Sequence, residues 1–62
     1  MSTENTILDD LCALLDSARD DNTKFFDRGN AAAGTRVRKI MQEVKALAQQ
    51  LRIDIQEAKN AE

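Results

Sequence analysis

Residues 25–39 read FFDRGNAAAGTRVRK, and this stretch decides how the rest of the chain can fold. It holds both Phe residues, both Gly residues and four of the nine cations of a 62-residue chain that contains no Pro. Gly29 tolerates the left-handed backbone angles that end a helix, and the side chain of Asn30 can cap the helix that follows. The stretch therefore predicts a turn at residues 29–30 between two antiparallel helices.

Apolar residues recur at spacings of three and four on both sides of this turn, which is typical of helices that pack along one face. We expect a single all-α domain over residues 1–62, a coiled-coil-like hairpin with helices over about residues 4–28 and about residues 31–59. In the second helix the seam falls on Val37, Ile40, Val44, Leu47 and Leu51. In the first helix the same spacing selects Leu8, Leu11, Leu15, Ala18 and Phe25.

Small residues at the start of the second helix predict a close approach of the two helices beside the turn. Folding the chain at residue 29 opposes Phe25 and Phe26 with two small residues, Ala33 and Gly34. A Gly inside a helix is less favourable than Ala by about 1 kcal/mol, so Gly34 indicates that the opposing rings need the room. We therefore expect both Phe side chains to pack against this small segment.

Both helices carry a wider apolar stripe than a two-helix hairpin can cover. A chain of this length buries only about 60% of its unfolded surface and usually needs an additional stabilising element. Cys12 is the only cysteine and His is absent, which excludes an intrachain disulfide and a zinc site built from Cys and His. Two copies are therefore expected to form a dimeric four-helix bundle. The outer apolar positions that we expect at the interface are Ile7, Leu14, Met41, Ala48 and Ile55.

The net charge of −2 conceals a segmented charge distribution. Residues 1–23 contain six acids and one cation, whereas residues 24–45 contain six cations and two acids. Long cationic side chains suit contacts with phosphates, so the second segment predicts an interface for the DNA backbone. The expected contacts are Lys24, Arg28, Arg36, Arg38, Lys39 and Lys45. The alternative interpretation is that these are ordinary surface cations, some of them paired with acids of the first helix.

The composition argues against catalysis and against a bound cofactor or metal. There is no His to act as a general base, and no Ser or Cys has a visible activating partner. The glycines do not fit a phosphate-binding loop, because no Lys followed by Ser or Thr comes after them. No apolar run approaches the roughly 20 residues of a membrane span, and no secretory signal is visible, so we expect a cytoplasmic protein. Cys12 is expected to be a small buried side chain.

The stretch from Lys24 to Asn60 resembles the N-terminal helical part of the bacterial histone H1-like proteins, typified by the chlamydial nucleoid protein. The shared features are the Gly-Asn turn, the following Ala-Ala-Gly, the basic pattern after it, and a Leu and an Arg farther along the helix. In this sequence they are Gly29, Asn30, Ala32, Ala33, Gly34, Arg36, Arg38, Lys39, Leu47 and Arg52. The sequence has Ala31 where the family usually has Lys, and its last residues, EAKNAE, are not the Lys/Ala-rich sequence of chlamydial members.

This resemblance implies a nucleoid-associated protein that binds DNA, with Arg36, Arg38 and Lys39 at the matching basic positions. Together with the segmented charge, it favours a non-enzymatic protein that binds DNA largely without sequence preference, through the basic residues near the tip of the hairpin. The alternative is an acidic coiled-coil module that dimerises or binds another protein without direct DNA binding.

Overall fold

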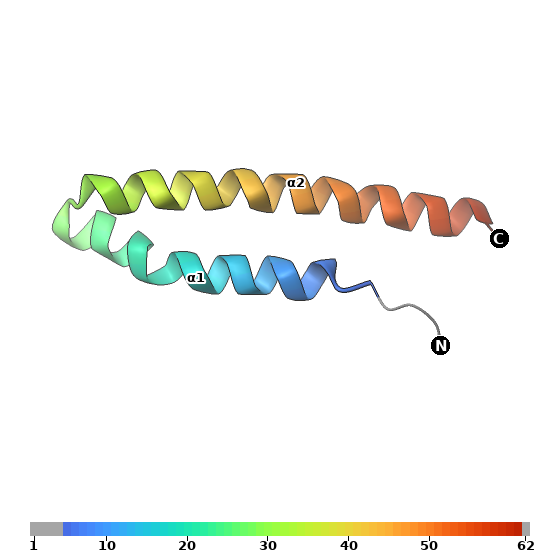
Figure 1. Cartoon of the computed structure of the whole chain (residues 1–62), viewed down its shortest axis with the longest axis horizontal. Coiled ribbons are helices and arrows are strands. Elements are labelled where there is room, and N and C mark those ends of the chain that lie inside the picture. Colours follow the sequence, from blue (N-terminus) through green and yellow to red (C-terminus); the bar gives the residue numbers. More distant parts are fainter. Residues whose placement is uncertain (1–4, 62) are drawn as a thin grey trace.

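The computed structural model describes residues 5–61, which form an antiparallel hairpin of two helices (Figure 1). Helix α1 runs from Ile7 to Arg28, and helix α2 runs from Ala31 to Ala61. The all-α hairpin that the sequence predicted is therefore confirmed over the described range. The expected helix start at residue 4 lies outside this range, while Asn5 and Thr6 precede α1 without being helical.

Two residues connect the helices, and each has a separate role. Gly29 has φ 67° and ψ 27°, a left-handed conformation that a residue with a Cβ rarely adopts. Its N–H donates to the carbonyl of Phe25 at 2.9 Å, and the N–H of Asn30 donates to the carbonyl of Lys24 at 3.2 Å. The Asn30 side chain in turn accepts a hydrogen bond from the N–H of Ala33 at 3.1 Å. Gly29 therefore ends α1, and Asn30 caps α2 immediately afterwards.

The seam between the helices is thin. Among residues 5–61 only Ala18 and Ala33 are buried, at 5% and 0% exposure. The remaining seam positions on α2 are half-buried and follow the heptad pattern read from the sequence, at Val37, Ile40, Val44, Leu47 and Leu51. Small side chains let the two backbones approach closely, but they bury little apolar area. A single hairpin consequently has almost no enclosed core.

Helix α1 is rotated relative to the sequence prediction. Leu8 and Leu15, which were expected at the seam, are 61% and 46% exposed. Ile7 and Leu14, which were expected on the outer stripe, are half-buried together with Leu11. The reason is that two stripes with three-and-four spacing overlap in this helix. When the stripe of Ile7 and Leu14 faces α2, Asp21 also lies beside α2, where its carboxylate accepts hydrogen bonds from Arg36.

Contacts at both ends of the hairpin fix its register. Beside the turn, the ring of Phe25 lies against Gly34. At the open end, the side-chain amide of Asn5 donates to a carboxylate oxygen of Asp54 at 2.9 Å. Helix α2 has 31 residues and α1 has 22, so the C-terminal end of α2 extends past the start of α1 (Figure 1). The whole hairpin measures 51 × 19 × 12 Å along its principal axes.

Candidate nucleic-acid interface

The two Phe residues next to the turn occupy different environments. A Cβ placed on Gly34 would lie 2.6 Å from Cδ1 and 2.8 Å from Cε1 of Phe25, so this ring fills the space that the glycine leaves. Phe26 meets Phe25 edge to face, with ring centroids 5.0 Å apart and planes at 85°. Phe25 is 40% exposed, whereas Phe26 is 74% exposed. The expectation that both rings pack on the small segment is therefore wrong for Phe26, because α1 turns its side chain outward.

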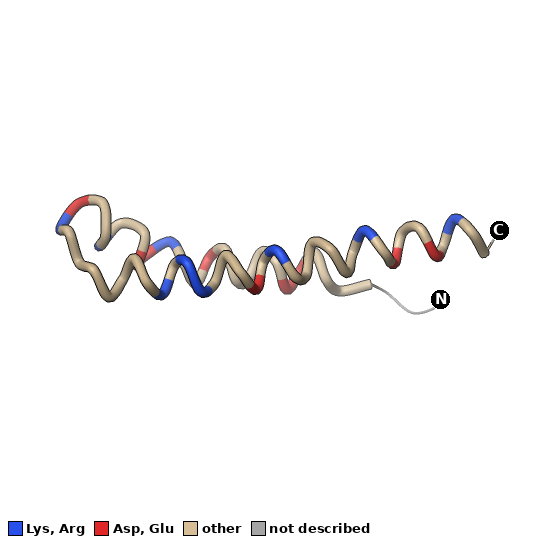
Figure 2. Tube along the Cα trace, turned by 90° about the horizontal axis from the view of Figure 1, so that it is seen from above, with Lys and Arg blue, Asp and Glu red and all other residues tan. Residues whose placement is uncertain are grey.

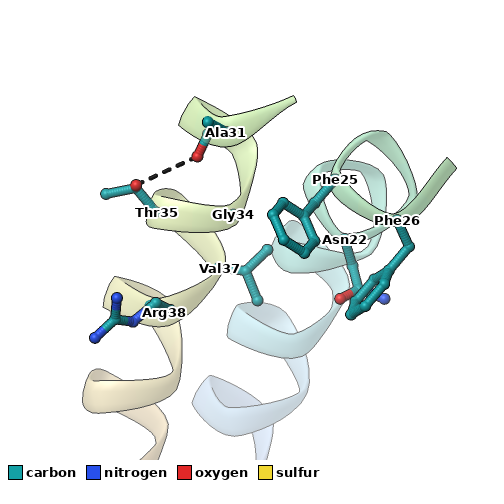
Figure 3. A pocket seen from close by; sticks show the side chains of 8 residues that line it. All are labelled: Asn22, Phe25, Phe26, Ala31, Gly34, Thr35, Val37 and Arg38. Carbon is teal, nitrogen blue, oxygen red and sulfur yellow. Dashed lines mark hydrogen bonds between the residues drawn. The ribbon is translucent and has the colours of Figure 1, made fainter. Parts of the chain in front are cut away.

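A cavity of about 400 Å³ opens beside these rings, and we call it the tip cavity (Figure 3). Figure 3 shows Phe26 and Asn22 side by side on α1, with Val37 of α2 pointing toward them and Arg38 on the outer side of α2. The hydroxyl of Thr35 donates to the carbonyl of Ala31 at 3.3 Å and is turned back onto its own helix. The lining is mostly apolar and consists of Asn22, Phe25, Phe26, Ala31, Gly34, Thr35, Val37 and Arg38.

Arg36, an expected DNA contact, binds Asp21 across the seam. Its Nε donates to Oδ2 and its Nη2 donates to Oδ1 of Asp21, each at 2.9 Å. Asp21 is only 17% exposed at its side chain, so α2 covers much of this carboxylate. The hydrogen bond from Arg36 is the main cause that lowers the pKa of Asp21, and the same bond raises the pKa of Arg36. A phosphate would therefore have to compete with Asp21 for this guanidinium.

The Asp21–Arg36 pair gives the stability of the hairpin a defined pH dependence. Because the folded-state pKa of Asp21 lies below its ordinary value of 3.8, the pair stabilises the fold above that pH and loses its effect as pH falls through the lowered pKa. Asp21→Asn is expected to be less stable than the wild type at pH 7, with a difference that shrinks below about pH 4. Thermal melts monitored by circular dichroism from pH 7 to pH 2 measure this. Asp20→Asn, at an exposed acid paired within α1, is the matched control. A difference in stability between Asp21→Asn and the wild type that stays constant over this pH range would show that the Asp21–Arg36 pair does not cause it.

Four of the six expected DNA contacts have exposed side chains and no ion pair among residues 5–61. We call these residues the tip cations: Arg28, Arg38 and Lys39 near the turn, together with Lys45, which lies midway along α2. Lys24 lies 3.6 Å from Asp20 in an exposed pair within α1, and such pairs contribute little to stability. Figure 2 shows Lys and Arg gathered around the turn and the first half of α2, and recurring toward its C-terminal end.

An exposed apolar strip runs along one face of the hairpin, formed by Leu8 and Leu15 of α1 and Met41 and Ile55 of α2. Leu15 and Met41 line one groove of about 360 Å³ between the helices, which places them on the same face. Leu8 lies one heptad before Leu15, and Ile55 lies two heptads after Met41, so both continue the strip. Ala48, also expected at an interface, lies between Met41 and Ile55 along α2 and is half-buried.

Cys12 is exposed, whereas the sequence predicted a buried side chain.

Other classes of site are not supported by the part of the chain that the structure describes. Within residues 5–61, no group of three or more His, Cys, Asp or Glu side chains is placed to hold a metal ion. Neither α1 nor α2, as described, combines the length and the apolar composition needed to cross a membrane.

Comparison with known protein families matches residues 5–61 to the family described as Histone H1-like protein Hc1. Comparisons with curated proteins and with solved structures give no match. The family match includes both helices, the Gly29–Asn30 turn and all four tip cations. The resemblance seen in the Gly-Asn turn and the basic residues after it is thereby confirmed, and the chain belongs to the histone H1-like protein Hc1 family.

Proposed function

We propose that this protein is a non-enzymatic, largely sequence-independent DNA-binding protein of the bacterial nucleoid, and that the tip cations contact the phosphates. Membership of a histone H1-like family supports this, since such proteins act structurally on DNA and not as enzymes. The observation that carries the proposal is that Arg28, Arg38, Lys39 and Lys45 have exposed side chains without an acidic partner among residues 5–61. Flexible cations of this kind bind the backbone of any DNA sequence.

The negative net charge does not oppose this function, because the charges are separated along the molecule. Asp9, Asp10 and Asp16 lie in the first half of α1, far from the turn. At 0.1 M salt the screening length is about 10 Å, which is short compared with the 51 Å hairpin. Near the turn, Asp20 and Asp21 are paired with Lys24 and Arg36, and Asp27 is an exposed acid next to Arg28. A phosphate at the turn therefore meets mainly the field of the tip cations.

The proposal predicts a strong salt dependence of DNA binding. Four phosphate contacts at a tip give a slope of log K against log salt of about −3.6, so affinity falls about 150-fold between 50 and 200 mM salt. Fluorescence anisotropy with a labelled duplex of about 20 base pairs measures this slope, and a second duplex of unrelated sequence tests sequence independence. Absence of binding at about 50 mM salt, or affinity that does not respond to salt, would contradict the proposal.

We further propose that the protein acts as a dimer in which the apolar strip of one copy covers that of another. The hairpin buries only two small residues of the described range, yet it exposes Leu8, Leu15 and Ile55 on one face. Contiguous apolar patches of this kind mark interaction sites on soluble proteins. The second candidate function, an acidic module that binds another protein, would use this same face, so a measurement of self-association separates the two.

Leu15→Ala is expected to weaken the dimer. Leu15 is about half exposed in the hairpin, and association covers this exposed part of the side chain. The buried apolar surface contributes about 1 kcal/mol in each copy to the free energy of association. Removing both side chains should raise the dimer dissociation constant roughly 30-fold, as measured by sedimentation equilibrium. Ile53→Ala is the matched control, because Ile53 is 39% exposed but does not belong to the strip. A wild-type monomer at all concentrations, or equal effects of the two substitutions, would refute the interface.

A further inference from the structure

We infer that two hairpins pair with their turns at the same end, so that α1 of each copy lies against α2 of the other. This inference rests on the dimer proposed above and specifies its geometry. Two hairpins whose apolar strips cover each other can be related by a two-fold axis that runs along the hairpin or by one that runs across it. The first places the two turns together and sets α1 against α2. The second places the turns at opposite ends and sets like helices against each other.

The charges beside the apolar strip distinguish these arrangements. On α2, Met41 and Ile55 are flanked at positions three before and four after them by cations, namely Arg38, Lys45, Arg52 and Lys59. On α1, the positions three before and four after Leu8 and Leu15 hold Asn5, Cys12 and Arg19, and Arg19 is paired with Asp16 at 3.0 Å. The acids Asp9 and Asp16 come one residue after Leu8 and Leu15, about 100° farther round the helix. Opposite-end pairing would set four cations against four cations. Same-end pairing sets the basic edge of each α2 against an α1 edge whose one cation is already paired and beyond which the acids lie.

The register of the hairpin brings these opposite charges to the same level. Because Phe25 is level with Gly34 and Asn5 with Asp54, each step along α1 corresponds to one step backward along α2. A rotation about a two-fold axis along the hairpin does not shift residues along that axis, so the same levels apply between the two copies. Asp16 of one copy then lies level with the segment between Arg38 and Lys45 of the other, and Asp9 lies level with the segment between Lys45 and Arg52. Each acid is thus level with the gap between two cations.

The tip cavity supports the same arrangement independently of charge. Phe26 is largely exposed, and it is level with the first turn of α2, where Ala31, Gly34 and Thr35 line the tip cavity (Figure 3). With the turns together, Phe26 of each copy lies over this first turn in the other copy and fills the largely apolar cavity there. With the turns apart, Phe26 lies over the open end of the other hairpin and stays exposed. Only same-end pairing covers this ring.

A distance measurement between copies tests the geometry. The exposed thiol of Cys12 is first removed by Cys12→Ala, and a nitroxide label is attached after Asp27→Cys at the tip or after Ala46→Cys midway along α2. Double electron–electron resonance should give a tip-to-tip distance on the scale of the 19 Å width of the hairpin, and not of its 51 Å length. The mid-helix label should give a short distance in either arrangement and serves as the control for association.

The outcomes separate this inference from the dimer itself. Short distances at both labels support same-end pairing. A long tip distance with a short mid-helix distance overturns the pairing but keeps the dimer. No distance at either label, or a short one at the tip alone, overturns the pairing together with the interface on the apolar strip. DNA binding is measured separately. Arg28 and Lys39 do not flank the apolar strip and stay available to phosphates in either arrangement, whereas Arg38 and Lys45 lie beside the other copy in same-end pairing.

The covering of Phe26 is tested by its own variant. Phe26→Ala should weaken the dimer by at least about 40-fold, because each dimer loses two largely exposed rings that association would bury. The helix content of the hairpin should not change, since the ring is exposed within one copy. Ile53→Ala again serves as the control. An effect of Phe26→Ala no larger than that of Ile53→Ala would show that the tip cavity of the other copy does not hold this ring.

Discussion

Gly34→Leu is expected to lower the free energy of unfolding by about 1–3 kcal/mol, the usual range for overpacking. Even the first carbon of the new side chain would lie 2.6 Å from the ring of Phe25, so this ring has to leave its place between the helices. Phe25 also supports Phe26 and begins the turn through its carbonyl, so the displacement extends to the whole tip. Urea or thermal unfolding at equal protein concentration measures the loss, since association contributes to stability.

The effect of Gly34→Ala on stability should depend on whether the ring of Phe25 is present, and this makes the prediction specific to their contact. In a Phe25→Ala background, Gly34→Ala no longer meets a ring, so the better helix propensity of Ala should stabilise the fold by about 1 kcal/mol. In the wild-type background the same substitution should stabilise less or destabilise. Ala32→Leu, at an exposed position in the same first turn of α2, controls for a large side chain near the turn. Equal effects of Gly34→Ala in the two backgrounds would refute the assigned contact.

Removing three tip cations together is expected to have the largest effect on DNA binding. The triple variant Arg28→Ala, Arg38→Ala and Lys39→Ala should flatten the slope of log K against log salt by about 2.7 for each tip that engages DNA. At 0.1 M salt this corresponds to a loss of affinity of about 500-fold. Arg36 is left in place because its guanidinium is held by Asp21 and is expected to contribute less.

The double variant Arg52→Ala and Lys59→Ala is the matched control, because both cations are exposed but lie in the second half of α2. It should retain most of the affinity. Sedimentation of both variants shows whether the dimer is kept, so that loss of DNA binding is not mistaken for loss of association. If both variants bind equally well, DNA contacts are not concentrated at the tip and the proposed interface is wrong.

The sequence was sufficient to predict the turn and the face of α2, because each rests on a strong local feature. Gly29 can end one helix and Asn30 can cap the next, and the long apolar repeat of α2 outweighs the shorter stripe of Met41, Ala48 and Ile55 beside it. The close contact of Phe25 with Gly34 followed from folding the chain at that turn. Local chemistry and periodicity were thus enough for the hairpin.

The rotation of α1 could not be predicted from apolar spacing. Leu8 and Leu15 form one stripe, Ile7 and Leu14 form another, and both stripes share the remaining apolar positions. The observed orientation brings Asp21 against Arg36, a polar contact between distant residues that periodicity does not register. The same pair holds the guanidinium of Arg36, an expected DNA contact, and the rotation also exposes Phe26. Both features of the candidate site therefore have a single geometric origin.

The two-residue turn also has a consequence for how the chain reaches its fold. Closing so short a connection loses little chain entropy, so the segments beside Gly29 can meet within microseconds, before residues farther apart do. Contacts between α1 and α2 then form in order from the turn toward Asn5 and Asp54, which are 49 positions apart in sequence. Transient opening should begin at that distant end. Amide hydrogens in the first turn of α1 will exchange with heavy water before those in the turns of α1 that precede Gly29.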